Sequence, residues 1–272
     1  MTLPLVISIQ SQVCYGHVGN SAAGFAMRSA GVELVEVPTA LLSNHPRHPT
    51  VHGKSFEPEF IADLLQGLTE RDLGRRASVI LSGFMGKAGT AKVVADFVRG
   101  CKAVNPDLIY MCDPVMGDID LGFFAAPELR AAFAEDLVPQ ADVIFPNAFE
   151  LGALSQIEIT SAEDVARARE AIGVKAVVCT SVLRPEAPGK IATVTATADS
   201  LDIAEVSALE VRPMGTGDLL GGLTAARVAL GLPLPQAVTK AVGGVRAALK
   251  HTGRGHTSEM PITERIAEIL RG

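Results

Sequence analysis

The sequence predicts an α/β fold in which a central, mostly parallel β-sheet is flanked by helices on both faces, with a short antiparallel segment at one edge. Two observations support this prediction. Short apolar or β-branched runs alternate with longer helix-like segments, and these runs are apolar enough to be strands buried on both faces. No linker, repeat or charge block divides the 272 residues, so we expect a single domain over residues 1–272.

The alternation begins at the N-terminus and continues through the first half of the chain. Residues 5–9 form the first predicted strand, and the Ala-rich residues 20–30 form the helix after it. Residues 58–69 carry apolar side chains at the 3.6-residue spacing of an amphipathic helix. In this half the predicted strands are residues 5–9, 33–37, 77–81, 108–112 and 142–145, and the predicted helices are residues 20–30, 58–69, 90–104 and 127–137.

The second half keeps the same rhythm and then changes. A predicted helix over 162–172 leads into a strand over 176–179. Residues 190–196 and 200–205, separated by a polar turn, are typical of antiparallel strands, and the remaining predicted helices are residues 219–230, 235–249 and 263–270. Ligands of a parallel sheet bind beyond the carboxyl ends of its strands, so candidate functional residues are sought there.

Composition excludes several classes of protein. Hydrophobic residues make up 48% of the chain, which is enough for a large core. The chain has 24 basic and 30 acidic residues, and the resulting net charge of −6 is not that of a basic nucleic-acid binder. The chain has no run of about 18 uninterrupted apolar residues, so the sequence predicts no membrane span. The four cysteines are far apart, without a CxxC pair, so we expect reduced thiols and a cytoplasmic location.

The most informative segment is Gly215-Thr216-Gly217-Asp218, which precedes a predicted helix. Two glycines at that point permit a sharp turn whose free N–H groups, with the helix dipole, favour a bound phosphate. A carboxylate beside such an anion site suits a base that takes a proton from an alcohol attacking a phosphoryl group. The alternative is an Asp that merely caps the helix after a glycine-rich turn.

A second set of carboxylates follows the later strands. Asp113 comes directly after a predicted strand, Asp118 lies five residues on, and Glu150 follows the next strand. Hard oxygen donors in loops suit Mg²⁺, which needs only one or two carboxylates besides phosphate oxygens and water. The alternative is a solvated turn whose acidic residues cap nearby helices.

Two other features are discounted. The stretch Gly83-Phe84-Met85-Gly86-Lys87 lacks the first glycine and the final Ser or Thr of a phosphate-binding P-loop, because Leu81 and Ala88 occupy those positions. His45, His48 and His52 share one loop, but neither a cysteine nor an acidic residue completes a metal-ligand set locally. We therefore interpret residues 43–55 as a polar loop.

Taken together, the motifs resemble the pyridoxal kinases, the vitamin B6 salvage kinases of the ribokinase-like superfamily. The resemblance covers nearly the whole chain. Gly215–Asp218 is shared across the superfamily, whereas residues 8–11 with 15–23 are much more particular to B6 kinases. The matching segments are residues 8–11 with 15–23, 43–45, 81–84, 112–118, 146–151, 180–181 and 215–218.

The resemblance implies ATP-dependent phosphorylation of the 5′-hydroxyl of pyridoxal, and of pyridoxamine and pyridoxine as further substrates. By resemblance, Asp218 is the catalytic base, and residues 118–124 form a lid that excludes water from the site. The resemblance further implies a homodimer and a monovalent cation as a candidate activator. It assigns the anion hole to the amides of Gly215, Thr216 and Gly217, and it assigns Mg²⁺ and the phosphates, partly through water, to Asp113, Asp118, Asn147 and Glu150. The nucleotide is assigned to Thr180 and Ser181, and the vitamer to Ser11, Val18, His45 and Phe84.

The chain departs from the family pattern on the vitamer side, at Gln12, at residues 46–49 and at Phe124, which stands where a lid tyrosine is frequent. Two alternatives remain. A hydroxymethylpyrimidine kinase has the same fold but usually carries Gly-Cys-Gly-Asp, with which Thr216 disagrees. A non-catalytic B6-binding protein would not need Asp218 as a base. We expect no nucleic-acid or membrane partner.

Overall fold

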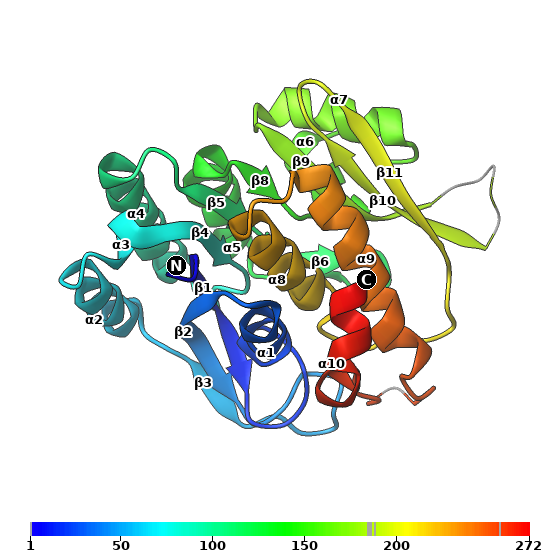
Figure 1. Cartoon of the computed structure of the whole chain (residues 1–272), viewed down its shortest axis with the longest axis horizontal. Helices are drawn as coiled ribbons and strands as arrows, with labels where there is room; N and C mark the ends of the chain where they lie inside the picture. Colours follow the sequence, from blue (N-terminus) through cyan, green and yellow to red (C-terminus); the bar gives the residue numbers. More distant parts are fainter. Residues whose placement is uncertain (1, 184–186, 188, 256) are drawn as a thin grey trace.

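A computed structural model describes residues 2–183, 187, 189–255 and 257–272. Its centre is a nine-stranded sheet with the strand order β11-β10-β9-β8-β5-β4-β1-β2-β3 (Figure 1). The strands of this sheet are β1 (Leu5–Val13), β2 (Glu33–Leu42), β3 (Gly53–Ser55), β4 (Ala77–Ser82), β5 (Ile109–Cys112), β8 (Val143–Ile144), β9 (Ala176–Leu183), β10 (Lys190–Ala196) and β11 (Leu201–Ser207).

The six strands from β2 to β9 in this order run parallel to one another, and the antiparallel pairs lie at the two ends of the sheet. β10 and β11 pair antiparallel at one end, and β3 pairs antiparallel with β2 at the other. In the register, Ile7 lies opposite Val35 on one side and Ile80 on the other. The predicted parallel sheet with an antiparallel edge segment is therefore confirmed.

Alternate residues of the central strands enter two separate cores. Ile7 and Tyr110 belong to one core, whereas their chain neighbours Val6 and Met111 belong to the other, as the two-residue period of a strand requires. The first core is covered by α2 (Pro58–Thr69), α4 (Ala88–Val104), α5 (Pro127–Ala132), α6 (Ala148–Ser155) and α7 (Ala162–Ile172). The second is covered by α1 (Asn20–Ala30), α8 (Thr216–Ala229), α9 (Leu234–Lys250) and α10 (Ile262–Arg271), which lie side by side in Figure 1.

The structure adds elements that the sequence pattern does not predict. These are β3, the short helix α3 (Leu73–Arg76), the helix α6 and a separate two-stranded hairpin made of β6 (Gly117–Asp118) and β7 (Gly122–Phe123). Elements of two to four residues are too short to show a hydrophobic period. The predicted helix over 127–137 is α-helical only to Ala132 and continues as a π-helical turn over Phe133–Leu137, followed by a 3-10 turn over Val138–Gln140.

A search of the described residues for a helix able to span a bilayer finds none.

Candidate active site

The carboxyl ends of neighbouring strands are tied together by backbone hydrogen bonds. In three of the four bonds the donor is the first residue after a strand, and in the fourth Thr180 of β9 donates to a residue just after β8. The residues that follow the strands are thereby held along a single edge of the sheet. The bonds run from Gly83 N to Ile9 O (3.0 Å), Asp113 N to Ser82 O (2.8 Å), Phe145 N to Cys112 O (2.9 Å) and Thr180 N to Pro146 O (3.0 Å).

The first turn of α8 lies at this edge. The helix begins at Thr216, three residues before the predicted start, so the amides of Thr216 and Gly217 belong to its first turn, where N–H groups have no partner within the helix. Gly215 precedes it with φ of +84°, and a Cβ there would lie 1.8 Å from the carbonyl oxygen of His17. Only glycine fits that position, and the turn presents amide hydrogens at a positive helix end.

Asp218 projects from this first turn and is half-buried. Burial raises the pKa of its carboxyl group, and a hydrogen bond from the backbone N–H of Gly19 opposes that shift. The net pKa is above the ordinary value of an Asp. A carboxylate with a raised pKa is a stronger base than an exposed one, which is what proton abstraction from an alcohol requires.

Asp113 lies directly across from the start of α8. A Cβ placed on Gly217 would be 3.6 Å from Asp113 Oδ2. Burial, and then the charges of Glu150 and Asp218, hold the pKa of Asp113 well above its usual range. Among the described residues, no group donates a hydrogen bond to its carboxylate. Three acidic groups thus share one region with too little positive charge to balance them, which favours binding of a cation.

Glu150 and Asn147 form a capping box at the start of α6. Glu150 Oε1 accepts hydrogen bonds from the amides of Met116 (2.8 Å) and Gly117 (3.2 Å), and Oε2 accepts one from Asn147 N (3.0 Å). Burial nevertheless raises the pKa of Glu150 to about 7. Because both oxygens already accept backbone bonds, this carboxylate fits contact with a metal through water better than direct ligation.

The side chain of Asn147 is also engaged within the fold. Its Oδ1 accepts a hydrogen bond from Glu150 N (2.9 Å), and its Nδ2 donates to Gly117 O (2.8 Å). The capping box therefore holds the base of the β6–β7 hairpin against α6, and its two side chains reach the strand edge where Asp113 lies.

The predicted lid, residues 118–124, covers all of this hairpin except its first residue, Gly117. Asp118 Oδ1 accepts hydrogen bonds from Asp120 N (2.9 Å) and Leu121 N (2.7 Å), which closes the tight turn. The Phe123 ring packs 4.7 Å from that of Phe149, so the hairpin is anchored at its base. Its tip is exposed, with Leu121 64% accessible to solvent. An anchored base and an exposed apolar tip suit a short segment that closes over a bound ligand.

A cavity of about 520 Å³ lies beside the lid tip. Arg212 donates to Asp120 Oδ2 at 2.5 Å, and the guanidinium of Arg47 donates to the backbone oxygen of Arg212. Both arginines line the cavity. These contacts connect the predicted lid to the segment leading into α8 and to the loop over residues 43–52.

The residues predicted to hold the vitamer lie at or after the ends of three neighbouring strands, β4, β1 and β2. Ser11 is 7% exposed, and its hydroxyl makes no hydrogen bond within the described residues, whereas Gly19 packs against its backbone. Val18 is buried in the same loop. The Phe84 carbonyl accepts a bond of 2.5 Å from Thr39 Oγ1. His45 is 1% exposed, and its ring faces Glu259 rather than open space.

The residues predicted to contact the nucleotide lie in β9. Thr180 pairs with Asn147 in an isolated parallel bridge, so both are at the same edge. Ser181 has a φ of +59°, which is uncommon for a residue other than glycine and carries a conformational cost. Such costs are frequent at functional sites, and its side chain is exposed.

Sequence reasoning missed the parts that support the site. Gly19, which donates to Asp218, is one of them. A buried polar network is another: Ser8 Oγ donates to Asn20 Oδ1 (2.7 Å), and Gln10 Nε2 donates to Ser8 Oγ (2.8 Å). This network joins β1 to the start of α1 and so holds the intervening loop. Ser8 and Gln10, two polar residues on either side of the buried Ile9, were the available signal.

Comparisons with known proteins identify the family of the chain. A family model described as phosphomethylpyrimidine kinase matches residues 26–262. A pyridoxine/pyridoxal/pyridoxamine kinase of Bordetella avium is 36% identical over 264 residues, which cover 96% of this chain and 89% of that protein. A pyridoxal kinase of Deinococcus radiodurans is 34% identical, covering 99% of this chain and 94% of its own.

A solved structure of a pyridoxal kinase is also similar to this chain. The pyridoxal kinase of Leishmania donovani in complex with ADP and pyridoxamine matches with a TM-score of 0.88 and 27% identity, over 97% of this chain and 95% of that one. The fold is thus the ribokinase-like fold expected from the sequence, and the chain belongs to the pyridoxal kinase family.

Proposed function

We propose that this protein transfers the γ-phosphoryl group of ATP to the 5′-hydroxyl of pyridoxal, and of pyridoxamine and pyridoxine, giving the 5′-phosphates. The observation that carries the proposal is the position of Asp218, with its raised pKa, in the first turn of a helix whose amides have no partner within the helix. This arrangement puts a proton acceptor next to a phosphate-binding helix end.

The reaction follows from these groups. The Asp218 carboxylate accepts the proton of the 5′-hydroxyl while the hydroxyl oxygen attacks the γ-phosphorus. The bond between that phosphorus and the bridging oxygen breaks, and ADP leaves with the oxygen. The amides of Gly215, Thr216 and Gly217 donate to the phosphoryl oxygens, where negative charge must be balanced during transfer.

A kinase of this family uses a divalent metal with ATP, and we propose Mg²⁺. The donor set fits a hard cation, because Asp113 has a free carboxylate and its pKa is raised by burial and by two neighbouring carboxylates. Asp113 would lie nearest the metal, with Asp118, Asn147 and Glu150 acting on metal and phosphates partly through water. Bound Mg²⁺ supplies charge neutralisation on the phosphates.

The remaining residues divide between the two substrates. Thr180 and Ser181 would contact the nucleotide from the end of β9. Ser11 would hydrogen-bond the vitamer ring, with Val18 and Phe84 lining its pocket and His45 bordering it. The free hydroxyl of Ser11, near Gly19 and hence near Asp218, supports this assignment.

Three further expectations belong to the proposal. A homodimer and a response to a monovalent cation are implied by family resemblance. A cytoplasmic location is supported by the four cysteines, each of which is a free thiol.

The test is a product analysis. The protein is incubated with Mg-ATP and, separately, with pyridoxal, pyridoxamine, pyridoxine and hydroxymethylpyrimidine, and products are resolved by chromatography. We expect a phosphate ester and one equivalent of ADP from at least one B6 vitamer.

The same experiment tests the two alternatives. Ester formation from hydroxymethylpyrimidine alone would favour the hydroxymethylpyrimidine kinase. Vitamer binding without any ATP-dependent product would indicate a non-catalytic B6-binding protein and contradict the proposal.

A further inference from the structure

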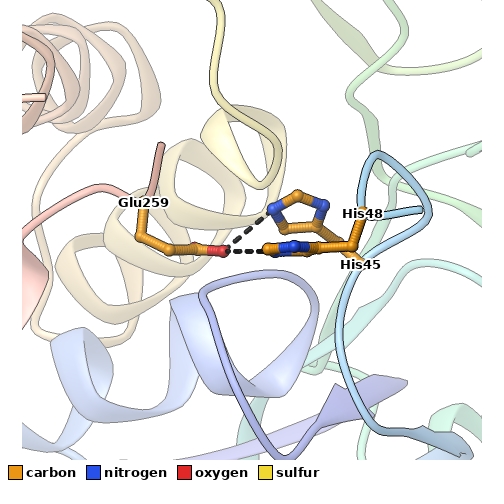
Figure 2. Close-up of side chains that lie close together, drawn as sticks. All are labelled: His45, His48 and Glu259. Atoms are coloured by element: carbon orange, nitrogen blue, oxygen red, sulfur yellow. Dashed lines mark ion pairs between the residues drawn. The ribbon is translucent and has the colours of Figure 1, made fainter. Parts of the chain in front are cut away.

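A compact cluster of two histidines and a glutamate lies outside the groups used for phosphoryl transfer. His45 and His48 come from the loop over residues 43–52, and Glu259 comes from the segment before α10 (Figure 2). Glu259 Oε1 is 2.8 Å from His45 Nε2 and 3.7 Å from His48 Nε2. The three atoms all lie within 4.8 Å of one another.

The ring nitrogens and the carboxylate converge and form the ion pairs drawn in Figure 2, but these contacts do not have the geometry of hydrogen bonds. The described residues contain nine buried side-chain nitrogen or oxygen atoms without a hydrogen-bond partner, and four of them are here: His17 Nδ1, His45 Nε2, His48 Nε2 and Glu259 Oε1. His45 itself is 1% exposed. Ion pairs with Glu259 are the contacts that the three histidine nitrogens have. Buried polar atoms normally find hydrogen-bond partners, and a cation bound between His45, His48 and Glu259 would supply a partner to all three side chains.

From this arrangement we propose that His45, His48 and Glu259 bind a zinc ion, through Nε2 of each histidine and Oε1 of the glutamate. A tetrahedral zinc with bonds of about 2.1 Å separates its ligand atoms by about 3.4 Å. The separations of 2.8 and 3.7 Å from the carboxylate oxygen lie on either side of that distance. Two imidazoles and one carboxylate form a donor set that zinc takes in proteins.

The other oxygen of the glutamate is already held. The backbone N–H of His17 donates to Glu259 Oε2 at 2.9 Å, which leaves Oε1 directed at the two histidines. Metal-binding carboxylates are commonly oriented in this way by an outer hydrogen bond. His48 is 20% exposed along its side chain, so the ion has a path from solvent, and a solvent molecule completes the fourth position.

Zinc at this position joins segments that are far apart in the sequence. It would link the loop over residues 43–52 to the segment before α10, and through Glu259 to the loop that carries His17. The carbonyl of His17 contacts Gly215, at the start of α8. The zinc site therefore stabilises the loops on the B6-facing side without taking part in phosphoryl transfer.

Binding has one structural consequence. Arg47 N donates to His45 Nδ1 at 3.3 Å, but a neutral His45 that ligates through Nε2 must carry its proton on Nδ1. The contact has to open when the ion binds. We therefore expect the backbone amide of Arg47 to show the largest NMR shift change within its loop on addition of zinc.

The test uses the full chain without an affinity tag. The protein is stripped with chelator, and binding of Zn²⁺ is measured by calorimetry, with retained metal measured by elemental analysis after dialysis. We expect one zinc per chain, a higher melting temperature, and visible d–d bands of a tetrahedral site when Co²⁺ replaces zinc.

Two variants remove ligands, and one serves as a matched control. We expect His48→Ala and Glu259→Gln each to weaken zinc binding at least 100-fold and to abolish the zinc-dependent rise in melting temperature. His52→Ala removes an exposed histidine from the same loop and should bind zinc like the unmodified chain.

Several results would overturn the proposal: less than a tenth of an equivalent of zinc retained, octahedral cobalt spectra, or equal zinc affinity in His48→Ala and His52→Ala. Each readout is independent of kinase activity, so failure of the zinc site leaves the proposed reaction untouched.

Discussion

Replacing Gly19 by alanine tests how closely the vitamer side is packed against the base. Gly19 has φ of +54°, and a Cβ there would lie 2.0 Å from Ser11 O and 2.6 Å from Ser11 Oγ. The shorter distance falls about 1.4 Å below ordinary van der Waals contact. Either Ser11 or the loop must move, and the Gly19 N–H that donates to Asp218 moves with it.

The stability cost has two parts. Alanine in a sparsely populated conformation with positive φ costs about 1–3 kcal/mol, and forcing an extra methyl group into a packed site costs about 1–3 kcal/mol more. Gly31→Ala is the matched control, because Gly31 has φ of +99° but nothing within 4 Å of the added Cβ. The control should therefore show only the conformational part.

Activity should separate the two variants further. A displacement of about 1 Å at a reacting centre costs about 100-fold in rate, so Gly19→Ala should lower kcat/KM by that factor, whereas Gly31→Ala should leave it unchanged. The assays are urea unfolding and initial-rate kinetics with pyridoxal. Equal unfolding free energies and equal kcat/KM in the two variants would refute the reasoning.

Two further predictions concern single side chains. Ser11→Ala should raise KM for pyridoxal about tenfold with little change in kcat. The measurement is of initial rates at varied vitamer concentration, and a loss confined to kcat would contradict the role of Ser11 in binding the vitamer ring. Burial raises the pKa of Asp142, but bonds from Lys102, Lys175 and the Tyr110 amide outweigh this and lower it. Asp142→Asn should therefore lose about 1–3 kcal/mol of stability at pH 7. Because the folded-state pKa is depressed, the difference in thermal unfolding should begin to shrink as pH falls below the ordinary value of 3.8 and should disappear only below the folded-state pKa. A pH-independent difference would exclude the ionic explanation.

The fold was largely predictable because buried parallel strands are apolar throughout and helices keep a 3.6-residue period. The order of the strands was not predicted, since pairing between distant segments depends on side-chain packing across the whole molecule. The lid hairpin was also missed as an element, because strands of two residues, such as Gly117–Asp118, have no period to detect. What appeared as a loop over 118–124 is closed by the Asp118 carboxylate.

The acidic centre was predictable for a different reason. Asp113 follows a strand and Asp218 opens a helix, and the carboxyl ends of parallel strands converge on one edge. The structure brings the two carboxylates close enough for the charge of Asp218 to help raise the pKa of Asp113. Glu150 joins them, but as a capping residue whose oxygens already accept backbone bonds.

The histidine loop shows where local reasoning fails. His45 and His48 were interpreted as part of a polar loop because no acidic residue lies near them in the sequence. Glu259 completes the set from the far end of the chain, in a segment that neither follows a strand nor begins a helix. No rule based on spacing identifies such a partner, and only the packing of the C-terminal segment against the loop over residues 43–52 brings it there.

The mechanism depends most directly on proton transfer to residue 218, and Asp218→Asn isolates that step because it keeps the shape of the side chain. With Mg-ATP and pyridoxal, we expect binding of both substrates to remain within a few-fold by calorimetry while kcat falls by about 100-fold or more. A variant that turns over at a near-normal rate would show that residue 218 is not the base and that proton removal depends on another group.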